Sequence, residues 1–545
     1  MAEKNPIAIE LAKKQKEVSV AEFFERNRHL LGFDNKRKAL LTVVKEAVDN
    51  SLDACEEARI LPEINVQIID MGNERFKISV EDNGPGIVKK QIPNIFAKLL
   101  YGSKFHSFKQ ARGQQGIGIS AAVLYAQLTT GRPAKITSRI SAKDPACYFE
   151  LHLDTKTNNP EIVKDEVVDW KKEHGTKIEL DIEATYQKGD QSVDTYLKET
   201  AIVNPHSTIV YTNPKAEQLV FPRATDVLPA EAKEIKAHPY GVELGRMKKM
   251  LDQTECRTLQ SFLTNEFSRV GPGTAKEICE NSALLSNMKP SELELPQIEK
   301  LMEGIKKTKI IAPPTDCIVP IGADLLEKGL KKEIAAEFYT AVSRPPDVYR
   351  GTPFVVECAL AYGGQQSGDV PLNLLRFANR VPLLYQQSSC AVFKSIINTN
   401  WKPYGLQQSQ GALPVGPLTL VVHLASVWPP FTSEAKEAIA HYPEIIKELK
   451  LALQECGRKL GLYVNKKRRA GEERERVNLF EAFIPELADA LAQLTGDKKD
   501  KLQENLSKML EKNKEFIIKN AGNVIDETDK DDDIKIKGSL EGSEE

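Results

Sequence analysis

Hydrophobic positions recur along the first 225 residues with two different periods. The segment 38–58 repeats apolar residues every three to four positions, which predicts a helix with one buried face. The segments 76–81, 177–182 and 208–211 alternate polar and apolar side chains or run apolar, as half-buried strands do. This mixture predicts an α+β sandwich in which helices cover one face of a mixed sheet.

The pattern changes where a cluster of prolines interrupts the alternation. Residues 226–308 are rich in Lys and Glu and predict helices, with a turn between two of them at 271–274 (Gly-Pro-Gly-Thr). Strand patterns return over 309–430, most clearly at 354–360 and 418–424. The chain is therefore predicted to carry a second α/β domain beyond a helical insert.

Helical spacing dominates much of the remaining chain. After Pro443 a helix of more than 20 residues is predicted, and a helical hairpin follows over about 472–520. From Asp526 to the end there are nine acidic and three basic residues, a composition that predicts disorder. This tail is either a solubilising tail or an electrostatic brake on nucleic-acid binding. The predicted parts are residues 1–225, 226–308, 309–470, 471–525 and 526–545.

Composition narrows the class of protein. The 545 residues include 75 Lys and Arg against 77 Asp and Glu, so the net charge of −2 excludes a globally basic, histone-like protein but not local nucleic-acid-binding patches. The eight cysteines form no Cys-x-x-Cys pair, which indicates free thiols in a reducing cytoplasm rather than a zinc site. No apolar run approaches the roughly 18 residues of a membrane span. The N-terminus lacks the pattern of a secretion signal, so we expect a cytoplasmic protein without a membrane partner.

Two short segments carry polar groups in positions suited to a ligand. In the predicted helix, Glu46, Asn50 and Asp53 fall within about 60° of one another, opposite the apolar stripe. The segment 82–86 (Asp-Asn-Gly-Pro-Gly) follows a predicted strand, and its glycines let the backbone pass close to a ligand. Each segment also has a plainer interpretation: a solvated helix face and an ordinary turn.

Two further segments are weak signals when taken singly. The segment 112–119 (Arg-Gly-Gln-Gln-Gly-Ile-Gly-Ile) precedes a helical run at 121–127, and backbone N–H groups at the start of a helix can cradle an anion. Its glycine spacing is neither that of a dinucleotide-binding loop nor that of a Gly-Lys-Ser/Thr phosphate loop. The segment 174–176 (His-Gly-Thr) leads into a predicted strand.

In this order and spacing, the four segments together resemble the signature of the GHKL ATPase family, which includes gyrase B, MutL, heat-shock chaperones and sensor histidine kinases. The resemblance implies a Bergerat-type ATPase domain over residues 1–225 that uses ATP and Mg²⁺. It assigns Mg²⁺ binding to Asn50 and activation of the attacking water to Glu46. It assigns adenine recognition to Asp82, supported through water by Thr176. The other nucleotide contacts that it implies are Gly84, Gly86, Ser103, Lys104, Arg112, Gly113, Gln114, Gln115, Gly116, Ile117, Gly118 and Ile119.

The strand-rich domain resembles the transducer of topoisomerases and MutL, in which a lysine reaches the γ-phosphate. By this resemblance we expect Lys436 to be that lysine. Thr432 or Ser433 could cap a helix, which would place Lys436 in or near its first turn, where its charge opposes the helix dipole. Without the resemblance, Lys436 is an ordinary surface lysine.

Residues 20–470 resemble more specifically the B subunits of archaeal-type topoisomerase VI, a type IIB DNA topoisomerase. The helical insert resembles their helix–two-turns–helix domain, and matching segments lie at 236–242, 350–357 and 401–405. The resemblance implies an ATP-operated gate that dimerises on ATP binding and captures a second DNA duplex. Strand passage, as relaxation and decatenation, would run through DNA cleaved by the A subunit in an A2B2 heterotetramer. The long helix would be the lever to the A subunit, and residues before about 25 would form a strap across the dimer.

DNA contacts and rival functions stay open. The basic residues proposed to meet phosphates of double-stranded DNA, in a nucleoid-associated protein, are Lys402, Lys466, Lys467, Arg468 and Arg469. The run 466–469 is alternatively a solvated helix end that suits the dipole. Trp401 and Tyr404 are expected to be packing residues. The rival functions are a MutL-like repair clamp and a GHKL scaffold that does not hydrolyse ATP.

Overall fold

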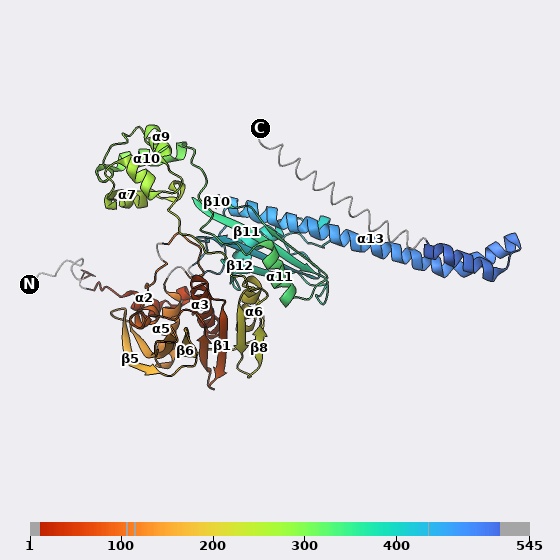
Figure 1. Ribbon diagram of the computed structural model, residues 1–545, viewed down its shortest axis with the longest axis horizontal. Helices are drawn as coiled ribbons and strands as arrows, with labels where there is room; N and C mark the ends of the chain where they lie inside the picture. The colour runs from red at the N-terminus through yellow and green to blue at the C-terminus, as the bar shows by residue number, and fades with distance from the viewer. Residues whose placement is uncertain (1–10, 13, 105–106, 114–115, 434, 513–545) are drawn as a thin grey trace, which may run out of the picture. The chain divides into compact units, whose positions relative to one another are not determined.

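The computed structural model describes residues 11–512 except 13, 105–106, 114–115 and 434 (Figure 1). The chain divides into two compact units. The first unit comprises residues 1–402 with 406–457, and the second comprises 403–405 with 458–545. The predicted acidic tail, the last residues of the predicted hairpin and residues 1–10 and 13 of the predicted strap lie outside the described residues.

The first unit contains an eight-stranded mixed sheet in the order β5-β4-β3-β6-β2-β1-β7-β8. Neighbouring strands are antiparallel except β1 and β7, which are parallel. Side chains of β1 alternate between buried and exposed along most of the strand, because one face of the sheet is covered. The strands are β1 (Glu63–Asp70), β2 (Arg75–Glu81), β3 (Ala134–Arg139), β4 (Ala146–Asp154), β5 (Asn159–Val168), β6 (Gly175–Glu183), β7 (Thr208–Thr212) and β8 (Gln218–Phe221).

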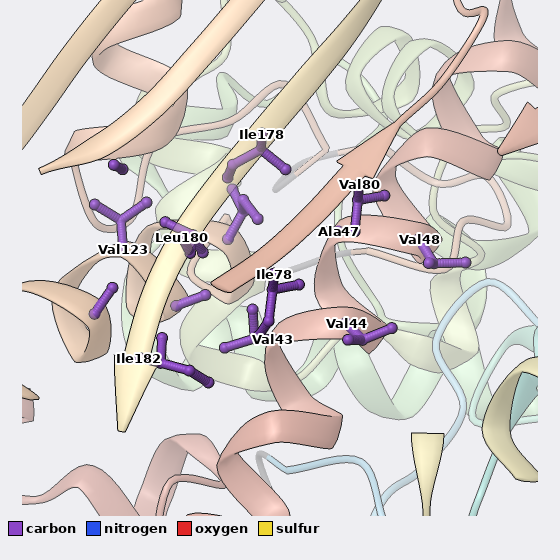
Figure 2. Close-up of a cluster of buried hydrophobic side chains, with 14 of the residues drawn as sticks. Val43, Val44, Ala47, Val48, Ile78, Val80, Val123, Ile178, Leu180 and Ile182 are labelled. Carbon is purple, nitrogen blue, oxygen red and sulfur yellow. The ribbon is translucent and has the colours of Figure 1, made fainter. Parts of the chain in front are cut away.

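Helices pack on the covered face of this sheet, which confirms the predicted sandwich. They are α2 (Val20–Arg26), α3 (Lys36–Glu57), α4 (Ile92–Ala97), α5 (Gly118–Thr130) and α6 (Val193–Val203). Helix α3 begins after Asn35, whose side chain accepts a hydrogen bond from the backbone N–H of Lys38. Its apolar stripe, including Val44 and Val48, belongs to one core with β2 and β6 (Figure 2). Burying each such side chain contributes roughly 1.5–3 kcal/mol.

The predicted helical insert contains four helices: α7 (Leu244–Gln253), α8 (Leu259–Glu266), α9 (Pro272–Asn281) and α10 (Leu295–Lys307). They enclose a separate small core around Phe262 and Leu301. Within the predicted turn, Pro272 is already the first residue of α9, because a proline lacks only an N–H that the first turn leaves unused.

A second sheet follows in the order β10-β11-β14-β12-β13, with β9 also paired to β11. Strand β14 is buried along its whole length, which explains its largely apolar sequence. The strands are β9 (Phe338–Ser343), β10 (Asp347–Tyr349), β11 (Thr352–Tyr362), β12 (Asn373–Ala378), β13 (Val381–Pro382) and β14 (Leu418–Ser426), and the helices of this region are α11 (Ala323–Glu333) and α12 (Ala391–Ile397).

Helix α13 (Pro443–Thr495) begins at the predicted proline and continues from the first unit into the second. The predicted start of a hairpin near residue 472 is wrong, because α13 passes through Gly471 without a break. A single glycine costs a helix only about 1 kcal/mol, which a long helix tolerates. The chain turns after α13 at Gly496, which has a positive φ of 77°, and residues 499–512 are again helical. Among the described residues, no helix is both long and apolar enough to cross a membrane.

Candidate active site

A cavity of about 660 Å³ in the first unit brings together most of the residues that sequence analysis selected. Gly84 and Arg112 do not line it, and Gln114 and Gln115 lie outside the described residues. The selected residues that line the cavity are Glu46, Asn50, Asp82, Gly86, Ser103, Lys104, Gly113, Gly116, Ile117, Gly118, Ile119, Thr176 and Lys436.

Asp82 is held rigidly at one end of the cavity. One carboxylate oxygen accepts from the backbone N–H groups of Gly84 (2.9 Å) and Thr176 (3.0 Å). The other accepts from the hydroxyl of Ser51 at 2.9 Å. Burial raises the pKa of Asp82, and these hydrogen bonds oppose that rise. Ser51 is not among the residues selected from the sequence, where its only signal is a hydroxyl on the buried side of α3.

Two glycines allow the backbone and side chains around the cavity to pack closely. Gly86 has a φ of 72°, and a Cβ atom there would overlap the carbonyl oxygen of Arg139. At Gly118 a Cβ atom would overlap the carboxylate of Glu46. Gly118 is also the first residue of α5, so the helix begins three residues earlier than predicted. The glutamate and the N-terminus of α5 are therefore neighbours.

The N-terminus of α5 and Lys104 give the cavity positive charge. The first backbone N–H groups of a helix have no partner within the helix and favour an anion. Lys104 contacts Asp53 with its ammonium nitrogen at 2.7 Å and Glu57 at 3.3 Å. Burial alone would raise the pKa of Asp53, but Lys104 and Arg112 outweigh it and lower that pKa. Asp53 therefore stays ionised and fixes both cations.

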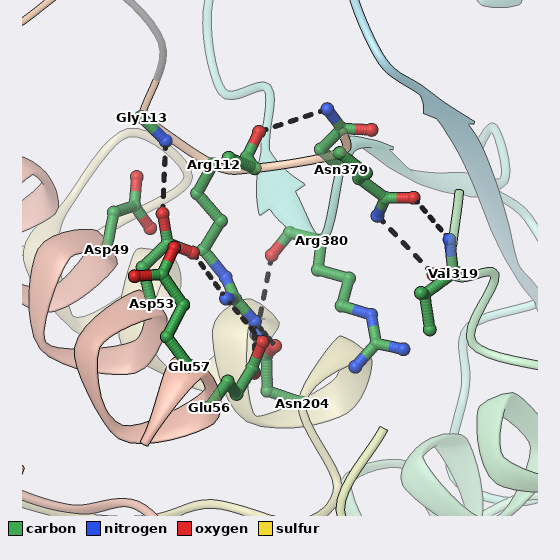
Figure 3. A network of polar contacts seen from close by, with 12 residues as sticks. Asp49, Asp53, Glu56, Glu57, Arg112, Gly113, Asn204, Val319, Asn379 and Arg380 are labelled. Atoms are coloured by element: carbon green, nitrogen blue, oxygen red, sulfur yellow. Dashed lines mark hydrogen bonds and ion pairs between the residues drawn. The ribbon is translucent and has the colours of Figure 1, made fainter. Parts of the chain in front are cut away.

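The guanidinium group of Arg112 is buried behind the cavity (Figure 3). It donates to Asp53 at 2.8 Å and to Asn204 at 2.5 Å, and it binds both carboxylate oxygens of Glu56, at 2.6 and 2.9 Å. Burial opposes the charge of Glu56, but Arg112 and His206 hold its pKa well below the ordinary value. The side chain thus ties the start of the glycine-rich segment to α3, and only the backbone of Arg112 is turned toward Lys436.

Lys436 comes from the second-sheet region and reaches the same cavity. Its ammonium group donates to the carbonyl oxygen of Arg112 at 3.2 Å. Burial lowers its pKa, and the negative charge of Glu46 opposes that effect. The predicted helix at Thr432 or Ser433 is wrong. The backbone N–H of Thr432 donates to the carbonyl of Ala438 at 2.9 Å, which closes a hairpin instead of a helical turn.

None of the residues proposed to contact DNA is among those that line this cavity. Lys402 is exposed in a short 3₁₀ turn, Lys402–Tyr404, and the segment 466–469 is exposed on α13 in the second unit. Trp401 is fully buried and donates its indole N–H to the carbonyl of Ile396 at 3.0 Å, so the prediction that it packs is confirmed.

Comparisons with known proteins place these features in a family. The model for the topoisomerase VI B subunit transducer matches residues 313–476. The model for the histidine kinase-, DNA gyrase B- and HSP90-like ATPase matches residues 35–157, which implies nucleotide binding. The transducer match covers the second sheet and the hairpin that carries Lys436. The ATPase match covers α3 and the glycine-rich segment.

Relatives match along almost the whole chain. The B subunit of type 2 DNA topoisomerase 6 from Methanococcoides burtonii is 53% identical over 488 residues, 89% of this chain and 78% of that protein. The corresponding protein from Methanosarcina mazei is 52% identical, with 89% and 79% covered. That from Archaeoglobus fulgidus is 48% identical, with 88% and 80% covered. On this evidence the chain belongs to the family of B subunits of type 2 DNA topoisomerase 6.

Proposed function

We propose that this chain binds and hydrolyses ATP and that ATP-driven dimerisation closes a gate on a second DNA duplex. The observation that carries the proposal is the single cavity lined by Glu46, Asn50, Asp82 and Lys436. Lys436 belongs to the transducer match and the other three belong to the ATPase match. The ATPase match and the transducer match both supply groups to this site. A bound nucleotide would therefore stabilise one arrangement of these two regions.

Asp82 suits recognition of the adenine amino group. An ionised carboxylate offers about four hydrogen-bond acceptor positions. Gly84, Thr176 and Ser51 occupy three of them. The position that is left can accept from an exocyclic amine, and the three fixed donors hold the carboxylate in place for it. Selection of adenine over a base without that amine follows from this arrangement.

The phosphates would lie between the N-terminus of α5, Lys104 and Lys436. No group of three or more His, Cys, Asp or Glu side chains suited to a metal exists in the described part of the chain. Asn50 lines the cavity, and its amide oxygen would hold Mg²⁺ together with phosphate oxygens and water, the oxygen ligands that Mg²⁺ prefers. When bound, Mg²⁺ would neutralise phosphate charge.

Glu46 would accept a proton from the attacking water. It lies one turn before Asn50 on α3 and is neighbour to the N-terminus of α5. A positioned general base typically contributes about 10²–10⁴-fold to a rate. Lys436 and the backbone N–H groups would stabilise the charge on the transferred phosphoryl group. The products would be ADP and phosphate.

The wider assembly follows from the family. We propose an A2B2 heterotetramer in which the A subunit cleaves the double-stranded DNA and this chain supplies the ATP-operated gate. Helix α13 would carry the closing motion toward the A subunit, because it continues out of the first unit as one helix. Strand passage driven in this way would relax and decatenate DNA.

The first test is the mass of the purified chain in solution, with and without a non-hydrolysable ATP analogue and Mg²⁺. We expect nucleotide to convert monomer to dimer in the wild type and in Glu46→Ala, since this glutamate acts only in hydrolysis. Asn50→Ala should stay monomeric because it loses the metal-bound nucleotide. Glu161→Ala, on the exposed strand β5, is the control and should dimerise normally.

A wild type that binds the analogue but stays monomeric would show that the isolated chain is not an ATP-closed gate. The chain would then be either a scaffold that does not hydrolyse ATP or a gate that closes only with its cleaving partner. Adding the A subunit and repeating the measurement separates these two outcomes.

A further inference from the structure

We propose that a buried ion pair between Lys38 and Glu437 is a positioning device that holds Lys436 over the phosphate-binding part of the cavity. The inference rests on the proposed ATP hydrolysis and adds two residues to it. Neither residue belongs to the motifs selected from the sequence. Lys38 lies in the first turn of α3, and Glu437 directly follows Lys436 in the hairpin.

The pair is buried and fixed by several neighbours. The Lys38 and Glu437 side chains are 12% and 7% exposed, and their charged groups are in direct contact. Lys38 also contacts Asp34 at 3.0 Å and lies 5.1 Å from the ring centre of Tyr385. Burial opposes the charge of Lys38, but Glu437 and Asp34 outweigh it and raise its pKa. Lys38 therefore stays protonated at neutral pH, and removing Glu437 leaves its buried charge without this partner.

Backbone hydrogen bonds join the two arms of the hairpin up to Thr432 and Ala438, and the backbone N–H of Lys436 donates to the carbonyl of Ser433 at 3.1 Å. Phe431 and Ile439 form a β-bridge, and the backbone N–H of Ala440 donates to the carbonyl of Pro430 at 2.7 Å. Nearer the tip, Lys436 has a positive φ of 54°, a conformation that residues other than glycine rarely adopt. A lysine stays there only where its surroundings hold it. The side chain of the next residue, Glu437, supplies such a restraint.

The ion pair attaches the hairpin to α3, the helix that carries the proposed catalytic groups. Lys38, Glu46 and Asn50 are spaced by eight and four residues along α3, and all three line the cavity. Eight residues of helix span about 12 Å. Glu437 therefore attaches the hairpin near the start of α3, while the Lys436 ammonium reaches the Arg112 carbonyl. The contact of Glu437 with α3 and the contact of Lys436 with the glycine-rich segment, made by consecutive residues, together fix where Lys436 lies.

The test measures ATP hydrolysis and analogue binding by the purified full chain. We expect Glu437→Gln and Lys38→Met each to lower kcat at least tenfold, while the Kd of a non-hydrolysable ATP analogue changes less than threefold. The charge-reversed double variant Lys38→Glu with Glu437→Lys should recover part of kcat, because the ion pair is restored. Glu327→Gln, which breaks the more exposed Lys331–Glu327 pair on α11, is the matched control and should leave kcat unchanged.

The decisive comparison adds Glu437→Gln to a Lys436→Met background. If the pair acts by positioning Lys436, its loss adds little once Lys436 is gone, whereas independent effects would multiply. An equal loss of kcat in both backgrounds, or a Lys436→Met variant with normal kcat, overturns this inference. A wild-type chain that hydrolyses no ATP overturns the proposed function itself, so the two failures are distinguishable.

Discussion

At the scale of single residues, Glu199 on α6 links folding to pH. It is buried beside the second-sheet region, and burial raises its pKa to about 8, with Arg376 of β12 opposing that rise. The folded chain thus keeps a proton that the unfolded chain releases above about pH 4.5. Because the folded state binds more protons in this window, stability should fall as pH rises from about 4.5 to 8.

The substitution Glu199→Gln should remove this dependence. At pH 8.5 we expect the variant to unfold at higher urea concentration than the wild type. The gain is a few kcal/mol at most, since one pKa unit corresponds to about 1.4 kcal/mol. At pH 4.5 or below, the two proteins should differ little. Glu173→Gln, at an exposed position, is the control. Equal midpoints for wild type and Glu199→Gln at pH 8.5 would contradict the prediction.

Single residues also show how much of the candidate site could be predicted from the sequence. Glu46, Asn50 and Asp82 were found because their chemistry lies within short motifs. Lys38 and Glu437 were not, because nothing local relates two residues almost 400 positions apart. Arg112 was predicted to contact the nucleotide as part of the glycine-rich segment, but the spacing of a motif does not reveal the direction of a side chain. Its carboxylate partners lie on α3, and only the fold brings them to it.

At the scale of elements, Arg112 is the point where four segments meet. Its side chain bonds α3, and Asn204 joins it to the end of α6. The Asn379 amide, between β12 and β13, donates to the carbonyl of Ala111 at 3.1 Å. These contacts run from the ATPase match to the transducer match (Figure 3). They should hold the start of the glycine-rich segment in a fixed place.

We therefore predict that Arg112→Lys destabilises the chain although the charge is kept. A lysine cannot reproduce the planar fork that binds Asp53, Glu56 and Asn204 together. Losing two bonds to charged groups should lower the free energy of unfolding by about 2–4 kcal/mol. Thermal unfolding measures the loss, and limited proteolysis should cut residues 107–119 faster. Arg132→Lys is the control, because Arg132 is exposed and its ion pair is with Asp181. Equal effects of the two substitutions would show that the network does not anchor the segment.

The elements themselves followed from periodicity where the pattern was long. The predicted strands and α3 all exist, and α13 begins at the predicted proline. The two errors have local causes. Thr432 and Ser433 resemble helix caps, but bonds across the hairpin decide that segment. Gly471 is a residue that weakens helices, but α13 continues through it because the sequence on both sides favours a helix. Short-range signals fail where long-range pairing or helix continuity is stronger.

At the scale of the whole molecule, the sequence reveals the order of the parts but not the pairing of strands. Strands β1 and β7 are adjacent and parallel although more than 130 residues separate them. No periodicity encodes that choice. The continuity of α13 was equally beyond local patterns, and it assigns the basic run 466–469 to the second unit, well after the last strand of the second sheet in chain order.

If the run binds DNA, its lysines should account for part of the salt dependence of binding. We expect the double substitution Lys466→Ala with Lys467→Ala to reduce the slope of log affinity against log salt by about 1.8, near 0.9 for each lost phosphate contact. Fluorescence anisotropy with a short DNA duplex at several salt concentrations measures the slope. Lys498→Ala with Lys501→Ala removes the same charge from exposed positions of the same unit and should change the slope less. Equal slopes for the two double variants would instead identify the run as a solvated stretch of helix, whose charge acts on DNA only through the net charge of the protein.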